Sequence, residues 1–217
     1  MSFIYAMSDI HAELEVFEEM LGLVDLEDPE NRLILLGDYL GPGHRDFAVL
    51  KAIMDLQKRF PGQVIAIKGN HEVDFLENDD TDVMDPKTLR WLQALPFFWE
   101  TDTQIFVHAG VVEDYPDMWK AATDDYTCAY KHPHTLGSFV KDVIAGHVGT
   151  ATISGDPNYH DVFWDGESHY YIDGTTEESG ILPLLKYDTT TGAYTSFINP
   201  ETREERPVRP QTDWRVL

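Results

Sequence analysis

The sequence predicts an α/β fold in a single domain. Three observations favour this class: short apolar runs alternate with segments of helical periodicity, the hydrophobic content of 42% is that of an ordinary globular protein, and no repeat or composition shift divides the 217 residues. A chain of this length can bury a sizeable core. We expect the domain to span residues 1–198, followed by a C-terminal surface tail over residues 199–217, where proline and charged residues are frequent.

Strands and helices are expected to alternate along the chain. Short apolar runs that end in polar residues predict buried strands, and "RLILLGD" (32–38) is the clearest of them. Apolar residues at helical spacing predict helices, the second of which ends at Pro61-Gly62. Asp85 followed by Pro86 is a typical helix start. In chain order we expect a strand over 2–8, a helix over 13–24, a strand over 32–38, a helix over 44–60, a strand over 63–70, a helix over 85–95, strands over 104–110 and 142–147, and a hairpin around 188–192.

The formal net charge of −23 is the strongest signal in the composition. It argues against nonspecific nucleic-acid binding, which needs a basic surface, and disfavours docking on anionic membranes. An acidic surface also repels phosphorylated substrates, so any phosphate site must supply local positive charge, most simply as metal ions. The single cysteine, Cys128, excludes an intrachain disulfide framework. The start "MSFIYAMSD" lacks the basic region of a signal peptide and no run of about 20 apolar residues occurs, so we expect a cytoplasmic protein.

Polar residues with metal-ligand chemistry stand at the ends of five predicted strands. In open α/β sheets, ligands bind outside the carboxyl ends of the strands. An aspartate at one strand end usually caps the following helix, but five strands that each deliver Asp, Asn or His beside a small residue indicate a metal site for divalent first-row ions. The motifs are "SDIH" with Asp9 and His11, "GD" with Asp38, "GNHE" with Asn70 and His71, "VHAG" with His108, and "AGH" with His147.

In their order, these motifs resemble those of the calcineurin-like metallophosphoesterase superfamily. More narrowly they resemble the phosphoprotein-phosphatase family, which includes bacterial Ser/Thr phosphatases and symmetrical dinucleoside tetraphosphate hydrolases. The resemblance covers residues 2–175, where "YYIDGT" (170–175) is similar to the strand that closes the family's core. It implies a four-layer α/β/β/α sandwich with a two-metal centre between the sheets, and hydrolysis of phosphate esters by a hydroxide that bridges the two metals.

The resemblance also implies a role for each residue of the motifs. Asp9 and His11 would bind the first metal, Asp38 would bridge both, and Asn70, His108 and His147 would complete the second. His71 matches the family's general acid, which protonates the leaving oxygen. Two divalent ions are implied, with manganese favoured and iron or zinc also suited to these ligands.

The sequence departs from the family pattern in the loop after Asp38. The family continues "GDxxDRG", whereas this chain has "GDYLGPG", so Gly41 replaces an Asp that would orient the catalytic histidine and Pro42 replaces an Arg that would hold the phosphate. Arg45 on the same loop, or Lys131 in "YKHPH", are candidates to supply the missing positive charge. Asp46 and Asp74 are candidates to orient His71.

The departure bears on the substrate. General-acid help matters most for alkyl esters such as phosphoserine, so the bare loop favours aryl phosphates and nucleotide anhydrides. The main prediction is a metal-dependent, Ser/Thr phosphatase-like phosphoesterase that acts on a phosphorylated small molecule, nucleotide or phosphoprotein. The alternative within this class is a hydrolase of nucleotide phosphoanhydrides, of the dinucleoside tetraphosphate type. From another class, a catalytically inactive metal-binding scaffold stays open. Nothing in the sequence predicts an oligomeric state.

Overall fold

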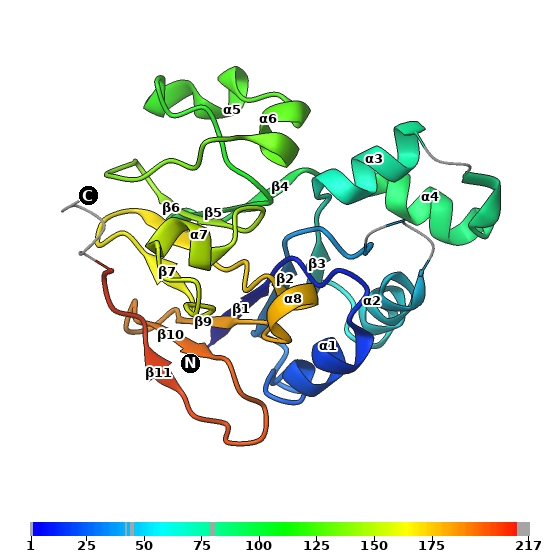
Figure 1. Ribbon diagram of the computed structural model, residues 1–217, viewed down its shortest axis with the longest axis horizontal. Helices are drawn as coiled ribbons and strands as arrows, with labels where there is room; N and C mark the ends of the chain where they lie inside the picture. Colours follow the sequence, from blue (N-terminus) through cyan, green and yellow to red (C-terminus); the bar gives the residue numbers. More distant parts are fainter. Residues whose placement is uncertain (1, 42, 44–45, 79–80, 212–217) are drawn as a thin grey trace.

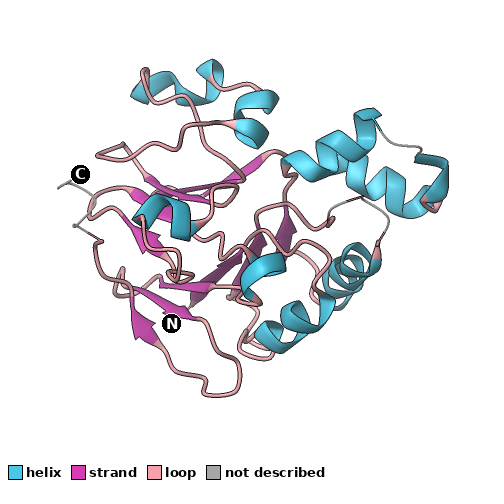
Figure 2. Ribbon diagram, viewed as in Figure 1, coloured by secondary structure: helices cyan, strands magenta, loops and turns pink. Residues whose placement is uncertain are grey.

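Two stacked β-sheets form the centre of the molecule, and helices lie on their outer sides (Figures 1 and 2). The structure is a computed structural model that describes residues 2–41, 43, 46–78 and 81–211. The first sheet has the strand order β11-β10-β9-β1-β2-β3 and the second β4-β5-β6-β8-β7. The strands are β1 (Phe3–Met7), β2 (Arg32–Leu35), β3 (Val64–Ala66), β4 (Phe98–Glu100), β5 (Gln104–Val107), β6 (Asp142–Ala145), β7 (Phe163–Trp164), β8 (His169–Tyr171), β9 (Leu184–Asp188), β10 (Tyr194–Phe197) and β11 (Arg206–Pro207).

The helices divide between the two outer faces. Four of them belong to the first half of the chain and four to the second, and two 3-10 turns cover Thr81–Val83 and Pro116–Met118. The helices in the described residues are α1 (Leu14–Leu21), α2 (Ala48–Arg59), α3 (Asn70–Asn78), α4 (Pro86–Ala94), α5 (Trp119–Ala122), α6 (Asp125–Tyr130), α7 (Thr150–Ser154) and α8 (Thr176–Ser179).

Three separate hydrophobic clusters lie between four layers. Because side chains alternate along a strand, Tyr5 and Met7 of β1 pack under α1 and α2, whereas Ile4 and Ala6 face the second sheet. A third cluster lies between the second sheet and α5, α6 and α7. Each cluster removes apolar surface from water at one interface between layers. The predicted α/β/β/α sandwich is therefore confirmed.

Parallel pairing brings the predicted motifs to one edge of each sheet. β1, β2 and β3 run parallel to one another, as do β5, β6 and β8. All six strands therefore deliver the residues that follow them to the carboxyl edge of their sheet. The hairpin of β9 and β10 and the start of α4 are as predicted, and the Asp85 side chain accepts hydrogen bonds from the backbone N–H groups of Lys87 and Thr88.

Several elements were not expected from the sequence, among them β4, β7 and the short helices α5 to α8, and two of them bear on the site and on the sheet edge. Helix α3 begins at Asn70, after a short turn that follows β3, and was not expected because few of its residues are apolar. Residues 206 and 207, expected in surface coil, form β11, which pairs with β10. The backbone groups on the outer edge of β10 gain hydrogen-bond partners in this way, which a strand at the edge of a sheet otherwise lacks.

Candidate metal centre

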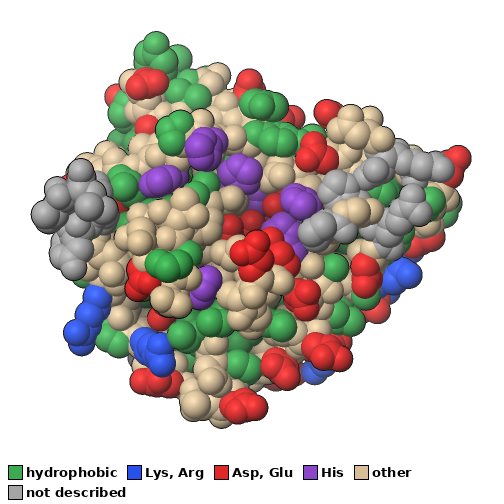
Figure 3. Space-filling view, viewed as in Figure 1, with side chains coloured by type: hydrophobic (Ala, Val, Ile, Leu, Met, Phe, Trp, Pro, Cys, Tyr) green, Lys and Arg blue, Asp and Glu red, His purple; other side chains and the backbone are tan. Residues whose placement is uncertain are grey.

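Seven residues from the predicted motifs converge where the carboxyl edges of the two sheets meet. Asp9 and His11 follow β1, Asp38 follows β2, Asn70 and His71 begin α3, and His108 and His147 follow β5 and β6. We call these seven residues the Asp38 cluster. All of them except the fully buried His108 line a cavity of about 300 Å³. Figure 3 shows histidine and acidic side chains gathered in a hollow at the centre of one face.

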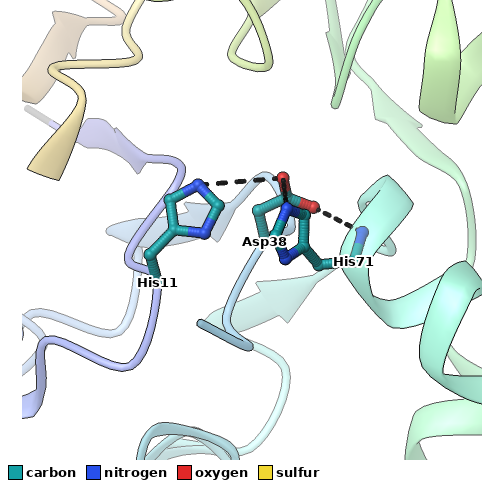
Figure 4. Close-up of side chains that lie close together, drawn as sticks. All are labelled: His11, Asp38 and His71. Atoms are coloured by element: carbon teal, nitrogen blue, oxygen red, sulfur yellow. Dashed lines mark hydrogen bonds and ion pairs between the residues drawn. The ribbon is translucent and has the colours of Figure 1, made fainter. Parts of the chain in front are cut away.

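The carboxylate of Asp38 lies at the middle of the cluster (Figure 4). Its Oδ2 lies 3.4 Å from His108 Nε2 and 3.9 Å from the Nε2 atoms of both His11 and His71. Potential ligand atoms of His11, Asp38 and His71 all lie within 4.8 Å of one another, and so do those of Asp38, His108 and His147. Asp38 thus belongs to two groups that could each hold a metal ion.

The remaining members complete these two groups. On one side, Asp9 Oδ1 lies 3.8 Å from His11 Nε2. On the other, Asn70 Oδ1 lies 2.9 Å from both His108 Nε2 and His147 Nδ1. Carboxylate and amide oxygens together with imidazole nitrogens are the donor set of divalent first-row metals.

Backbone carbonyl groups orient two of the imidazoles. His108 Nδ1 donates to the Leu36 carbonyl at 2.9 Å, and His11 Nδ1 donates to the Leu40 carbonyl at 3.2 Å. A carbonyl can only accept, so each Nδ1 carries the hydrogen and each Nε2 faces the cluster. Metal-bound histidines are commonly oriented by such a bond from the other ring nitrogen. The two rings are therefore already placed as metal ligands would be.

Four candidate ligands have a left-handed backbone conformation. Their φ angles are 55° at Asp9, 48° at His11, 52° at Asp38 and 65° at His147. Residues with a side chain rarely adopt this region, at a cost of about 1 to 3 kcal/mol each, and such strain concentrates at functional sites. The surrounding structure must therefore impose these conformations.

The buried carboxylate of Glu72 holds the strained loop around Asp38. It accepts hydrogen bonds from the backbone N–H groups of Asp38 (2.7 Å), Tyr39 (2.8 Å), Leu40 (3.1 Å) and Gly69 (2.9 Å). The loop after β2 and the start of α3 are thereby joined through one side chain. Sequence reasoning did not single out Glu72, although it is the last residue of the "GNHE" motif.

Two glycines leave room for the carboxylates of the cluster. A Cβ atom at Gly69 would lie 2.1 Å from Asp38 Oδ1, and one at Gly146 would lie 2.1 Å from Asp9 Oδ2. No side chain fits at such a distance, so the small residues at the strand ends serve close approach of the carboxylates to the backbone.

The cavity also contains two acidic residues that sequence reasoning missed, Asp173 and Glu177. Glu177 Oε2 lies 3.9 Å from His11 Nε2. Burial and the nearby charge of Asp9 raise the pKa of Asp173 well above its usual value. The signal for Asp173 was present, because "YYIDGT" is another strand that ends in aspartate and glycine.

The electrostatics of the cavity favour bound cations. Burial, together with the charge of Asp38, raises the pKa of Asp9 to about 7. Burial acts in the same direction on Asp38, but the charge and hydrogen bond of His108 lower the pKa of Asp38 below its usual value. Burial would lower the pKa of His108, yet the charge of Asp38 raises it to about 10. In the described part of the chain, four carboxylate side chains line the cavity and no lysine or arginine does. Metal ions would supply the positive charge that these carboxylates need.

Neither candidate for the missing positive charge is among the described residues that line the cavity. Arg45 lies outside the described residues, as does Pro42, and Lys131 is placed elsewhere. The Lys131 ammonium donates to the Val111 carbonyl at 2.6 Å and to Glu113 Oε1 at 2.8 Å, and Lys131 does not line the cavity. A Cβ atom at Gly41 would lie 2.9 Å from the His11 carbonyl oxygen, so the backbone has no room for a side chain there.

The two candidates for orienting His71 each have another partner. Asp46 Oδ1 accepts from the backbone N–H of Ala48 at the start of α2, and Asp74 Oδ1 accepts from the Tyr130 hydroxyl at 2.7 Å. His71 is instead positioned by its backbone N–H, which donates to Asp38 Oδ1 at 3.0 Å, and by the edge of the His11 ring.

Comparison with known proteins agrees with this geometry. The model of the calcineurin-like phosphoesterase family matches residues 4–188. A symmetrical bis(5'-nucleosyl)-tetraphosphatase from Chromobacterium violaceum is 32% identical over 127 residues, which cover 52% of this chain and 44% of that protein. One from Nitrosococcus oceani is 27% identical over 143 residues, covering 58% and 48%. The chain thus spans about half the length of these relatives.

Solved structures share the fold. A protein serine/threonine phosphatase from Saccharomyces cerevisiae has a TM-score of 0.64 at 10% identity, over 96% of this chain and 80% of the other. A metallophosphoesterase from Sphaerobacter thermophilus has a TM-score of 0.55 at 15% identity, over 91% and 88%. Among the described residues, no helix is both long and apolar enough to cross a membrane.

Proposed function

The chain belongs to the calcineurin-like phosphoesterase family, and we propose that it hydrolyses phosphate esters with two divalent metal ions bound at the Asp38 cluster. One observation carries the proposal: the Asp38 carboxylate is shared by two groups of ligand atoms. A carboxylate is suited to bridge two dications, and the cavity around it contains further carboxylates and no lysine or arginine among its described lining residues.

The two metal positions follow from the neighbours of Asp38. Asp9 and His11 would hold one ion, and Asn70, His108 and His147 would hold the other. When bound, two such ions polarise a phosphoryl group and lower the pKa of water enough to provide hydroxide at neutral pH. Mixed oxygen and nitrogen ligands suit manganese, and also iron or zinc. Manganese, the number of ions and the expected cytoplasmic location stay predictions.

His71 is proposed to donate a proton to the leaving oxygen. Its ring is half-buried at the rim of the cluster, and Nε2 lies 3.9 Å from Asp38 Oδ2. The backbone N–H of His71 donates to Asp38 and its ring packs against the edge of the His11 ring, where the family would have the orienting aspartate that is absent at residue 41. The grouping of His11, Asp38 and His71 also allows His71 to be a metal ligand, so metal content must be measured together with turnover.

Metal dependence and the Asn70→Ala variant test the proposal. Protein stripped with a chelator should not hydrolyse p-nitrophenyl phosphate, and manganese, iron or zinc should restore the rate. Asn70→Ala should lose at least about 100-fold in kcat, since the Asn70 amide contacts two candidate ligands. Asn158→Ala, an exposed asparagine bonded within its own turn, is the matched control. A rate that survives metal removal, or that is equal in Asn70→Ala and the parent, would contradict the assignment. Metal binding without hydrolysis of any phosphate substrate would leave the inactive scaffold.

A nucleotide phosphoanhydride hydrolase is the second candidate. Two observations support it: the relatives from Chromobacterium violaceum and Nitrosococcus oceani bear the name of a dinucleoside tetraphosphatase, and Gly41 has no room for the aspartate that would assist a poor leaving group. Turnover should be faster on a dinucleoside tetraphosphate or on p-nitrophenyl phosphate than on a phosphoserine peptide. Fastest turnover of the peptide would reject this preference.

A further inference from the structure

A second cavity lies beside the candidate metal centre, between α3 and α6. Its volume is about 320 Å³, and it is lined by Val73, Glu77, Phe97, Asp125, Tyr126 and Tyr130. Helices α3 and α6 pack against each other at this point (Figure 1). A cavity of this size lies at the lower end of the range for small-molecule sites.

Helix α3 connects this cavity with the metal centre. Val73 and Glu77 follow Asn70 by three and seven residues, so they lie on the same face of α3, about 4.5 and 10.5 Å further along its axis. The Tyr130 hydroxyl lies 3.4 Å from the Asn70 carbonyl oxygen and donates to Asp74 at 2.7 Å. A group attached to a phosphate at the Asp38 cluster could therefore reach the cavity.

Aromatic rings provide stacking surfaces in the cavity. Tyr126 is 70% exposed and stacks on Tyr130, with 4.7 Å between ring centroids and 16° between planes. Phe97 forms another wall. An exposed aromatic side chain held flat against a second ring is suited to bind another planar ring.

Polar groups of both signs surround these rings. Glu77 and Asp125 bring carboxylates, which only accept hydrogen bonds. The Lys68 ammonium lies 4.6 Å from the centre of the Phe97 ring, and its charge interacts with that of Asp125. Lys68 itself is buried, at 8% exposed, and is not among the residues that line the cavity.

This combination selects one class of occupant. The carboxylates of Glu77 and Asp125 disfavour an anion, and the stacked tyrosines favour a planar ring. A planar ring whose edge carries amino donors can stack on the tyrosines and donate hydrogen bonds to the carboxylates. We propose that this cavity binds the nucleobase of a nucleotide whose phosphate lies at the Asp38 cluster. The proposal rests on the proposed function, because it makes nucleotides the substrate class.

Nucleoside binding tests the cavity without any catalytic step. The ligands are adenosine and guanosine at millimolar concentration, and binding is measured by saturation-transfer NMR and calorimetry on metal-free protein. At least one nucleoside should bind. Tyr126→Ala should weaken it about 5- to 100-fold, as loss of one base–aromatic stack does. Tyr115→Ala, which removes a comparably exposed tyrosine outside the cavity, should bind like the parent.

Turnover provides the second readout. Tyr126→Ala should lower kcat/KM for a dinucleoside tetraphosphate and leave that for inorganic tripolyphosphate, which has no base, unchanged. Nucleoside binding that depends on Tyr126, in a protein that hydrolyses no phosphate, would overturn the proposed function and retain the nucleobase site. The absence of nucleoside binding, equal binding by Tyr126→Ala and the parent, or equal losses on both substrates would overturn the nucleobase site.

Discussion

The stability of this protein should fall in alkaline solution because of one buried histidine. His169 is 1% exposed; its Nδ1 lies 3.2 Å from Asp165 Oδ2 and its Nε2 lies 3.0 Å from Glu113 Oε2. Burial alone would lower the pKa of His169, but hydrogen bonds to the two carboxylates raise it from 6.5 to about 9. Burial likewise opposes ionisation of Asp165 and Glu113, yet the hydrogen bonds with His169 lower the pKa of each. The three residues therefore form a buried ionic cluster.

The sign and size of the effect follow from this raised pKa. A folded-state pKa above the unfolded value means that the folded state binds the proton more tightly. The stabilisation is therefore complete below about pH 6.5 and is lost as the pH rises through about 9. At 1.36 kcal/mol per pH unit, the difference between 6.5 and about 9 corresponds to about 3 kcal/mol of the free energy of unfolding.

Urea unfolding at a series of pH values measures this quantity. The free energy of unfolding of the parent and of His169→Gln is followed by circular dichroism between pH 6 and pH 10. Near pH 6 the variant should be less stable, because it removes the cation beside the buried Asp165 and leaves Glu113 with Lys131 as its cationic partner. The difference between the two proteins should shrink by about 3 kcal/mol toward pH 10. Using the difference removes the contribution of other titrating groups, and parallel curves over the whole range would refute the reasoning.

Three further predictions concern the Asp38 cluster. The Glu72 carboxylate has two acceptor oxygens for four backbone N–H groups, and Glu72→Gln keeps only one of these oxygens as an acceptor. The free energy of unfolding should therefore fall by about 3 kcal/mol and metal affinity should weaken; a melting temperature equal to the parent's would contradict this. His71→Gln should lower kcat about 100- to 1,000-fold while metal analysis still finds two ions, whereas loss of an ion would make His71 a ligand. Gly69→Ala should displace the Asp38 carboxylate, destabilise the protein by about 2 kcal/mol and abolish metal binding, while Gly22→Ala, with a milder contact of 3.1 Å, should retain it; normal metal binding by Gly69→Ala would contradict the close approach.

Sequence reasoning placed the strand-end residues well because they depend on local pattern and on one topological rule. Each motif follows an apolar run, and parallel strands deliver their carboxyl ends to a common edge, so His11, Asp38 and His108 meet although they are far apart in the chain. Helix α3 was missed because its buried positions include Glu72, a residue that hydropathy assigns to the surface. The environment of Lys131 was equally hidden, since its ion pair with Glu113 depends on the packing of two loops.

The left-handed backbone at four candidate ligands has a consequence for how this chain can change. Glycine would adopt the same φ angles without strain, so replacing Asp9, His11, Asp38 or His147 by glycine relieves backbone energy while it removes a ligand. Stability and metal binding thus make opposite demands at the same four positions. A chain maintained only as a folded scaffold would face no selection to keep a strained Asp or His there. That all four are still Asp or His fits a protein that is maintained for what it binds.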